Sequence, residues 1–226
     1  MKKIFIFGVG TISDVVFQYF SDAGDYKVEG FVEYDEIINS TTKFGVPIVR
    51  LSKLEQTFPA NKYEGFVAIG YKNFNFEREK VYKLLKEKNY KLCSLISKKS
   101  VIAKNVDIGE NCLILENQTI QPYVQIKDNV YLWSGNHIGH HSIIYENTFV
   151  SSHVVISGNC KIGKNCFIGV NASIADGIEI KNRCTIFMSA SINKNLIDET
   201  IVVSKNSEII RDDDKRSKII LNKFYK

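Results

Sequence analysis

The histidines of this chain gather in one short stretch. All four of them, His137, His140, His141 and His153, fall between positions 137 and 153 of the 226-residue sequence. An imidazole ring titrates near neutral pH, so it can accept a proton from an attacking amine or hydroxyl group. The stretch therefore predicts a site of general base catalysis, with a solvated polar face as the alternative interpretation.

A hexapeptide repeat carries these histidines. Aliphatic residues recur at every sixth position from Ile102 to Ile192. A period of six fits neither a helix nor one long strand, and it is typical of short strands joined by turns, with the aliphatic side chain pointing inward. Three strands would complete a coil in about eighteen residues. The repeat predicts a β-helix of roughly five coils, and none of the histidines occupies an inward position.

A second inward column follows the first at a distance of four residues. Its members are small or β-branched, and they include Cys112, Cys160, Cys166 and Cys184. No C-x-x-C pair exists, so we expect these cysteines to be core residues, and we predict neither a metal site nor a disulfide.

Glycine stands directly after the inward aliphatic residue at positions 109, 139, 163 and 169. We expect these glycines to turn the corners of the coil, some of them at positive φ.

The first part of the chain alternates strand and helix patterns. We expect strands over residues 3–9, 27–33, 64–70 and 91–96, and helices over 13–20, 52–58 and 76–88. This alternation predicts a small, mostly parallel sheet of the Rossmann-like class. The apolar run at the start is too short and lacks the cleavage site of a signal peptide, so a cytoplasmic protein is expected.

Ligands of such sheets bind at the carboxyl ends of the strands. Gly8 and Gly10 form half of a dinucleotide fingerprint, but Ser13 replaces its third glycine, so NAD is not predicted and a plain tight turn is an equally good interpretation. The other candidate substrate-binding residues near expected strand ends are Glu33, Tyr34, Asp35, Gly70, Tyr71, Asn75 and Arg78.

The overall composition excludes several functions. The formal net charge of +5 comes from scattered lysines among acidic residues, so no nucleic-acid partner is expected. No apolar stretch reaches the ~18 residues of a membrane span, so no membrane association is expected.

A parallel α/β domain followed by a hexapeptide β-helix resembles the sialic acid O-acetyltransferase-type sugar acetyltransferases, which include the bacillosamine- and perosamine-type enzymes. The resemblance covers nearly the whole chain. It implies a Rossmann-like sugar-nucleotide-binding domain over residues 1–98, a left-handed parallel β-helix acyltransferase domain over 99–195, and a strand and helix tail over 196–226. It also implies acetyl-CoA as co-substrate, a nucleotide-linked sugar as acceptor, and a homotrimer.

The same resemblance assigns roles to the residues around the histidines. It makes His140, two positions after the inward Ile138, the general base. Where the bacillosamine-type enzymes carry an acidic residue directly after this histidine, the chain has His141, the second catalytic candidate. The partner that orients His140 stays open, with Glu146 and Asp128 as candidates.

Ligand contacts follow from the resemblance as well. The backbone N–H of Gly158 would stabilise the oxyanion and contact acetyl-CoA. The other residues expected to bind acetyl-CoA are Lys161, Lys164, Lys181 and Arg183, and those expected to join the substrate site are Asn136, His137 and His153.

These features predict an acetyl-CoA-dependent N-acetyltransferase that acts on a nucleotide-linked amino sugar for surface polysaccharide or glycan biosynthesis. A sugar O-acetyltransferase and a non-catalytic β-helix scaffold remain alternatives. A β-helix carbonic anhydrase would need three separated histidine ligands, and His137, His140 and His141 are too crowded for that.

Overall fold

The computed structural model describes residues 1–205 and, in the C-terminal segment, Arg216 and Ile219. The helix expected within residues 211–226 otherwise lies outside the described residues. None of the helices in the described part of the chain has the length and apolarity needed to cross a membrane.

The N-terminal part is a five-stranded sheet with three helices and one 3₁₀ turn. The sheet order is β3-β4-β2-β1-β5, and every neighbouring pair is parallel except β3 with β4. The elements are β1 (Lys2–Phe7), α1 (Thr11–Ala23), β2 (Tyr26–Glu33), β3 (Thr42–Lys43), β4 (Val46–Arg50), η1 (Leu51–Lys53), α2 (Leu54–Thr57), β5 (Glu64–Val67) and α3 (Phe76–Glu87).

The mostly parallel sheet is confirmed, and the hairpin of β3 and β4 is an addition to it. The hairpin turns at Phe44 and Gly45, both at positive φ. Two-residue β3 is too short to show a pattern of alternating apolar residues, so the sequence gives no signal for it.

Alternation along β1 divides the core of this domain. Ile4 and Ile6 pack with α1 and with one face of the β-helix, while Phe5 and Phe7 pack with α2 and α3 on the other side of the sheet. All four side chains are fully buried. One face of the sheet is therefore also the surface on which the two parts of the molecule meet.

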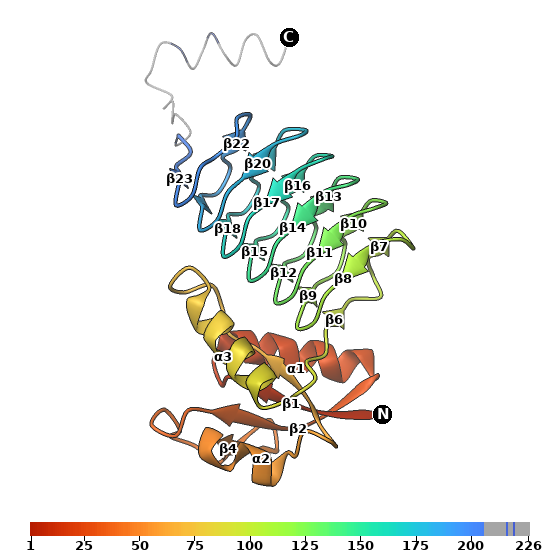
Figure 1. Ribbon diagram of the computed structural model, residues 1–226, viewed down its shortest axis with the longest axis vertical. Helices are drawn as coiled ribbons and strands as arrows, with labels where there is room; N and C mark the ends of the chain where they lie inside the picture. Colours follow the sequence, from red (N-terminus) through yellow and green to blue (C-terminus); the bar gives the residue numbers. More distant parts are fainter. Residues whose placement is uncertain (206–215, 217–218, 220–226) are drawn as a thin grey trace.

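The second part is a left-handed parallel β-helix with three flat faces, drawn as the ladder that rises from the N-terminal domain in Figure 1. Face 1 consists of β7 (Val101–Ile102), β10 (Thr119–Ile120), β13 (His137–Ile138), β16 (Val155–Ile156), β19 (Ser173–Ile174) and β22 (Ser191–Ile192). Face 2 consists of β8 (Asp107–Ile108), β11 (Gln125–Ile126), β14 (Ile143–Ile144), β17 (Lys161–Ile162) and β20 (Glu179–Ile180). Face 3 consists of β6 (Leu95–Ile96), β9 (Leu113–Ile114), β12 (Tyr131–Leu132), β15 (Phe149–Val150), β18 (Phe167–Ile168), β21 (Thr185–Ile186) and β23 (Ile201–Val202).

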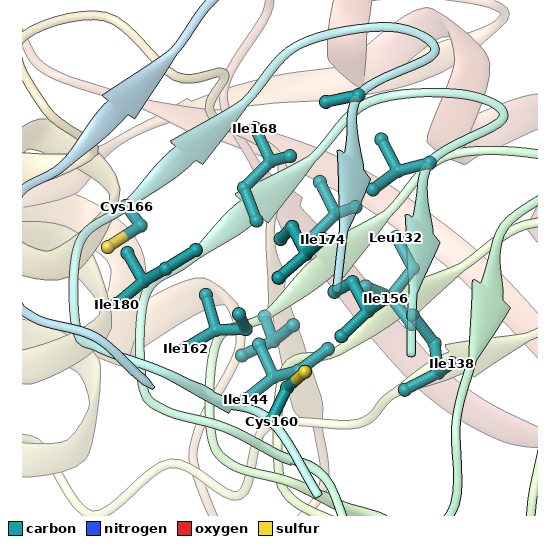
Figure 2. Close-up of a cluster of buried hydrophobic side chains, with 14 of the residues drawn as sticks. Leu132, Ile138, Ile144, Ile156, Cys160, Ile162, Cys166, Ile168, Ile174 and Ile180 are labelled. Carbon is teal, nitrogen blue, oxygen red and sulfur yellow. The ribbon is translucent and has the colours of Figure 1, made fainter. Parts of the chain in front are cut away.

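The register confirms the predicted coil length. Ile120 pairs with Ile138, and Ile138 with Ile156, so successive coils are eighteen residues apart. The inward aliphatic columns form one continuous core that includes Cys160 and Cys166 (Figure 2). All five cysteines are buried and free, Cys93 among them, so the assignment of the other four to the core is confirmed.

The expectation of positive φ at Gly109, Gly139, Gly163 and Gly169 is wrong. The left-handed residue of each corner comes two positions later, where asparagine is most frequent. Glycine is needed because the coils approach closely: a Cβ on Gly163 would stand 2.5 Å from the carbonyl carbon of Lys181, one coil later. Backbone contact between coils, rather than backbone conformation, selects these glycines.

The two parts join at residues 92–96. Leu92 forms a bridge to Gly65 at the edge of the N-terminal sheet, while Leu95 and Ile96 already pair with β9 of the β-helix. The strand expected over residues 91–96 is thus divided between both parts, with Ser94 at the transition.

Candidate active site

His140 lies at the corner between faces 1 and 2, and its side chain is exposed. Its Nδ1 atom stands 3.1 Å from Nδ1 of His141. This is hydrogen-bond distance. In such a bond one of the two nitrogens carries the proton and donates it, and the other nitrogen accepts. The backbone N–H of His140 donates to Oε1 of Gln121 at 2.9 Å, which fixes the chain at this corner.

His141 occupies the left-handed corner position, with φ of 59°. Its ring stacks on Tyr123 of the preceding coil, with 4.6 Å between the ring centroids. Histidine and asparagine tolerate this backbone region better than most residues do. The left-handed backbone of the corner therefore favours a residue such as His141 at this position. The stacked Tyr123 fixes the direction of the His141 ring.

Gly158 stands one coil after His140 in the same position of the repeat. A Cβ on Gly158 would come 2.8 Å from Nε2 of His140 and 2.9 Å from Oδ1 of Asp176, which holds the same position one coil further on. Only a residue without a side chain lets both groups converge here. The backbone N–H of Gly158 forms no hydrogen bond within the described residues.

Neither candidate for the orienting partner of His140 is near it. Asp128 and Glu146 lie at the corner between faces 2 and 3. Asp128 accepts a hydrogen bond from the hydroxyl of Tyr82 at 2.8 Å, and Glu146 lies 3.4 Å from Nζ of Lys164. His141 stands where the orienting group is needed.

The four cationic candidates are spread over two places. Lys161 is exposed on β17 of face 2, three residues after Gly158, and no acidic side chain in residues 1–205 pairs with it within 4.0 Å. Lys164, Lys181 and Arg183 lie at or next to the corner between faces 2 and 3, and each has a carboxylate partner. Of the four, Lys161 is the cation beside the His140 corner.

The carboxyl ends of the N-terminal strands gather a second set of predicted residues. Gly8 ends β1 at φ of 114°, and a Cβ there would stand 2.8 Å from the carbonyl oxygen of Ala68. Gly10 precedes α1 with open space around its Cα. The carboxylate of Glu33 accepts hydrogen bonds from the backbone N–H groups of Val9 and Tyr34, at 3.2 and 2.9 Å, so it holds the glycine turn in place.

Asp35 and Tyr34 turn away from this edge. Asp35 accepts hydrogen bonds from the backbone N–H and the hydroxyl of Ser52, and these bonds lower the pKa of its carboxyl group. The ring of Tyr34 packs edge-on against Phe7, with 5.4 Å between the centroids. Both residues stabilise the loops around the site.

The glycine turn is accompanied by a lysine that the sequence did not single out. Nζ of Lys43, on β3, donates to the carbonyl oxygen of Val9 at 2.5 Å and forms an ion pair with Asp14. It brings a cation to the amino end of α1, where the helix dipole already favours anions. Lys43 lies far along the chain from Gly8, so no local motif reveals it.

Tyr71 covers the boundary between this edge and the β-helix. It follows Gly70, is 51% exposed, and packs against Phe149 and Phe167 of face 3, with centroid distances of 4.9 and 4.7 Å. An exposed aromatic ring beside the glycine turn can stack on a base or a sugar ring.

Three of the predicted substrate-binding residues have buried side chains that bond to the protein itself, namely Arg78, Asn75 and Asn136. Arg78 is fully buried, stacks at 4.4 Å over Tyr131, and donates to the carbonyl oxygens of Gly70 and Asn147 at 3.0 and 2.6 Å. Burial lowers the pKa of Arg78 to about 10, so the guanidinium stays charged at neutral pH. Arg78 fastens α3 to the β-helix.

Asn75 and Asn136 are buried for related reasons. Asn75 donates to the carbonyl oxygen of Cys166 at 3.1 Å and accepts from Arg78 at 3.0 Å. Asn136 bonds to the backbone of Trp133 and, at 2.7 Å, of Val154. Both side chains thus direct an amide donor and the carbonyl oxygen at protein groups in the interior.

The two remaining histidines lie apart from each other. His137 points outward on face 1 beside the His140 corner, paired in register with Thr119 and Val155. His153 is exposed in a left-handed position at the corner between faces 3 and 1, where its ring lies over Gly135. No group of three or more His, Cys, Asp or Glu side chains in the described residues is arranged to hold a metal ion.

The two halves of the site lie on opposite sides of the β-helix. The N-terminal domain packs on face 3 and on both corners that flank it, through pairs such as Tyr19 with Glu116 and Tyr82 with Asp128. The His140 corner is the one that face 3 does not touch. Within one chain, the glycine turn and His140 are therefore separated by the body of the β-helix.

Two known domain families match the chain. The PglD N-terminal domain matches residues 3–85, and the hexapeptide repeat of succinyl-transferase matches residues 160–194. No curated protein sequence matches the chain significantly.

Solved structures resemble the chain over most of its length. The acetyltransferase domain of PglB from Neisseria gonorrhoeae is 21% identical, with a TM-score of 0.79 over 89% of this chain and 96% of that chain. PerB from Caulobacter crescentus, in complex with CoA and GDP-perosamine, is 21% identical, with a TM-score of 0.79 over 89% of this chain and 93% of that chain. WeeI from Acinetobacter baumannii is 20% identical, with a TM-score of 0.53 over 90% of this chain and 97% of that chain. The predicted fold class and order of domains are confirmed.

Proposed function

We propose that this chain, which has the fold and domain order of the hexapeptide-repeat sugar acetyltransferases, transfers an acetyl group from acetyl-CoA to the amine of a nucleotide-linked sugar. The reaction would serve surface polysaccharide, such as O-antigen, or glycan biosynthesis in the cytoplasm. Sugar O-acetylation is the second candidate, because a histidine base serves a hydroxyl acceptor as well.

One observation carries the proposal: one ring nitrogen of His140 is held by His141, and the other lies beside a glycine. Nδ1 faces His141 at 3.1 Å, and the Nε2 edge lies against Gly158, whose N–H is free within the described residues. A non-catalytic scaffold gives no reason for an oriented histidine and an unused N–H to meet at a glycine.

These groups support direct transfer. His140 accepts a proton through Nε2 from the ammonium group of the acceptor while Nδ1–H donates to His141. The free amine attacks the thioester carbon, the new C–N bond forms, and the C–S bond breaks as the nitrogen passes its second proton to the CoA thiolate. The N–H of Gly158 donates to the oxyanion of the tetrahedral intermediate, and a donor of this kind contributes ~10²-fold or more to kcat.

Ligand positions follow from charge and exposure. Lys161 lies beside the His140 corner and has no acidic side chain within 4.0 Å in residues 1–205, so it is the candidate for the CoA phosphates. The acceptor's nucleotide would bind at the glycine turn of Gly8 and Gly10, with its phosphates near Lys43 and the amino end of α1. Tyr71 would contact the base or the sugar.

The separation of the two half-sites supports a homotrimer. A nucleotide-linked sugar bound at the N-terminal domain of one subunit cannot reach His140 of the same subunit around the β-helix. In a closed ring, the His140 corner of one subunit can face the glycine turn of its neighbour. Acetyl-CoA would then lie between adjacent β-helices.

Related structures agree with these ligands. PerB was solved with CoA and GDP-perosamine, and variants of that enzyme with one histidine replaced by asparagine or alanine also hold both molecules. A structure of the PglB domain contains acetyl coenzyme A.

The direct test is His140→Ala, assayed by release of free thiol from acetyl-CoA with nucleotide-linked amino sugars such as GDP-perosamine as acceptors. Loss of the base should lower kcat by about 10²- to 10⁴-fold and leave both KM values near those of the unmodified enzyme. Val170→Ala, which alters the same repeat position at another corner, is the matched control for folding. Near-normal kcat in a folded His140→Ala protein would contradict the assignment.

A further inference from the structure

Asp176 faces the catalytic corner from the coil after Gly158. Its Oδ1 lies 2.9 Å, and Nε2 of His140 lies 2.8 Å, from the same point, the place where a Cβ on Gly158 would stand. The carboxylate and the base therefore border one small space on opposite sides, above a glycine that leaves the space open. A ligand group packed against the Cα of Gly158 would lie between the carboxylate and the base.

Acidic and amide residues in this repeat position have a structural role elsewhere in the β-helix. Oδ1 of Asp128 accepts from the backbone N–H of Glu110 at 2.9 Å, and Oδ1 of Asn182 accepts from that of Lys164 at 2.9 Å. Asp198 does the same for Asn182 at 2.7 Å. Each side chain ties its coil to the preceding one.

Asp176 departs from this rule. The N–H of Gly158 is the group it would bind by analogy, yet Asp176 forms no hydrogen bond or ion pair within the described residues. Its side chain is exposed, and a free carboxylate beside the base has no stabilising role in this coil. Its position is explained if it acts on a ligand.

We propose that Asp176 binds the protonated amine of the acceptor and so selects an amine over a hydroxyl group. The inference rests on the proposed function and concerns its acceptor. A carboxylate attracts an ammonium group by a charge-assisted hydrogen bond, whereas a neutral hydroxyl gains less and its alkoxide is repelled.

The charges balance along the reaction. The ammonium group arrives at Asp176 and gives one proton to Nε2 of His140. The free amine attacks the thioester carbon, its nitrogen gaining positive charge that Asp176 stabilises as the C–N bond forms. The nitrogen loses its second proton to the departing thiolate, which leaves as CoA thiol. His140 then releases its proton to solvent.

Other side chains surround this space. The ring of His141 faces Nδ1 of the base and stacks on Tyr123, Gln121 accepts from the backbone N–H of His140, and Lys161 follows Gly158 on face 2. Asp176 is the carboxylate whose oxygen lies, together with the ring of His140, nearest to the Cβ position of Gly158.

The test compares Asp176→Asn with the unmodified enzyme on two probes. One probe is GDP-perosamine, and the other is the same nucleotide sugar with a hydroxyl in place of the amine. We expect kcat/KM for the amine probe to fall about 10- to 100-fold, the loss typical of a charge-assisted hydrogen bond. The kcat/KM for the hydroxyl probe should stay the same or rise. The KM for acetyl-CoA should stay the same.

Asp198→Asn is the matched control, since it removes the same charge from the same repeat position at another corner. An Asp176→Asn enzyme with an unchanged ratio of amine to hydroxyl activity would overturn the role of Asp176 and leave the acetyltransferase proposal intact. An unmodified enzyme that prefers the hydroxyl probe would do the same. Failure of the unmodified enzyme on both probes would overturn the proposed function, and this inference with it.

Discussion

His140 and His141 are neighbours in sequence with different structural tasks. His140 exposes one ring nitrogen at Gly158, while His141 sits in a left-handed position with its ring stacked on Tyr123. A neutral imidazole can accept the Nδ1–H of His140, as a carboxylate does in other histidine bases, but it brings no negative charge. In the proposed mechanism, His141 is therefore a positioning residue.

Two replacements of His141 distinguish its effect on the orientation of the His140 ring from the effect of a negative charge beside that ring. His141→Ala should lower kcat by about tenfold and leave the KM for acetyl-CoA unchanged, because the base loses its partner but the binding groups remain. His141→Glu should restore kcat and move the acid limb of the kcat/KM profile to higher pH, since a carboxylate favours protonation of the ring beside it.

The measurement is the pH dependence of thiol release by each variant. Asn171→Ala, which removes the side chain from another left-handed corner, controls for backbone strain. Identical kcat values and identical acid limbs in all of these proteins would show that His141 has no part in positioning His140.

At the scale of elements, buried side chains at the start of α3 bind α3 to the β-helix. Residues 73–75 form three successive left-handed residues ahead of α3, and Asn75 and Arg78 then bind backbone carbonyls of the β-helix. Arg78 also bonds to the carbonyl of Gly70, next to the exposed Tyr71. The same contacts that join the two parts thus shape the loop that carries Tyr71.

We expect Arg78→Ala to destabilise the protein by about 2–5 kcal/mol, because it opens a cavity and leaves the carbonyls of Gly70 and Asn147 unpaired. Arg78→Lys should recover only part of this, since an ammonium group cannot span both carbonyls. Urea unfolding measures the loss, and Lys80→Ala on the exposed side of α3 is the control. Unchanged stability with a raised acceptor KM would instead make Arg78 a substrate ligand.

At the scale of the whole molecule, the glycine turn and His140 lie on opposite sides of the β-helix of one chain. Face 3 carries the N-terminal domain, and the corner that holds His140 lies opposite face 3. A trimer would bring complementary half-sites of two subunits together and would cover exposed faces of the β-helix.

Mixed oligomers test this arrangement. Gly10→Asp places a carboxylate in the open space at the glycine turn and should repel the acceptor's phosphates, while His140→Ala removes the base. Each variant alone should be nearly inactive, and co-expression of the two should restore measurable thiol release, because some sites combine an intact turn with an intact histidine. Co-expressed variants that form mixed trimers but stay inactive would place both half-sites in one subunit.

The sequence by itself determined the β-helix, its eighteen-residue coil, the burial of the cysteines and the outward position of the histidines. These properties repeat with a period of six, so a residue's number alone tells whether its side chain points inward. The parallel N-terminal sheet could be predicted for a similar reason, since its strand and helix patterns are local.

Only the tertiary structure decided which residues from distant parts of the chain contact each other. Asp176 could have been noticed from the column that it forms with His140 and Gly158 at eighteen-residue spacing, but its lack of a backbone partner appears only in three dimensions. Lys43 contacts the glycine turn because β3 lies beside it in the fold. Arg78 and Asn75 are buried because α3 packs against the β-helix. Contacts between distant elements depend on packing geometry, which local sequence patterns do not encode.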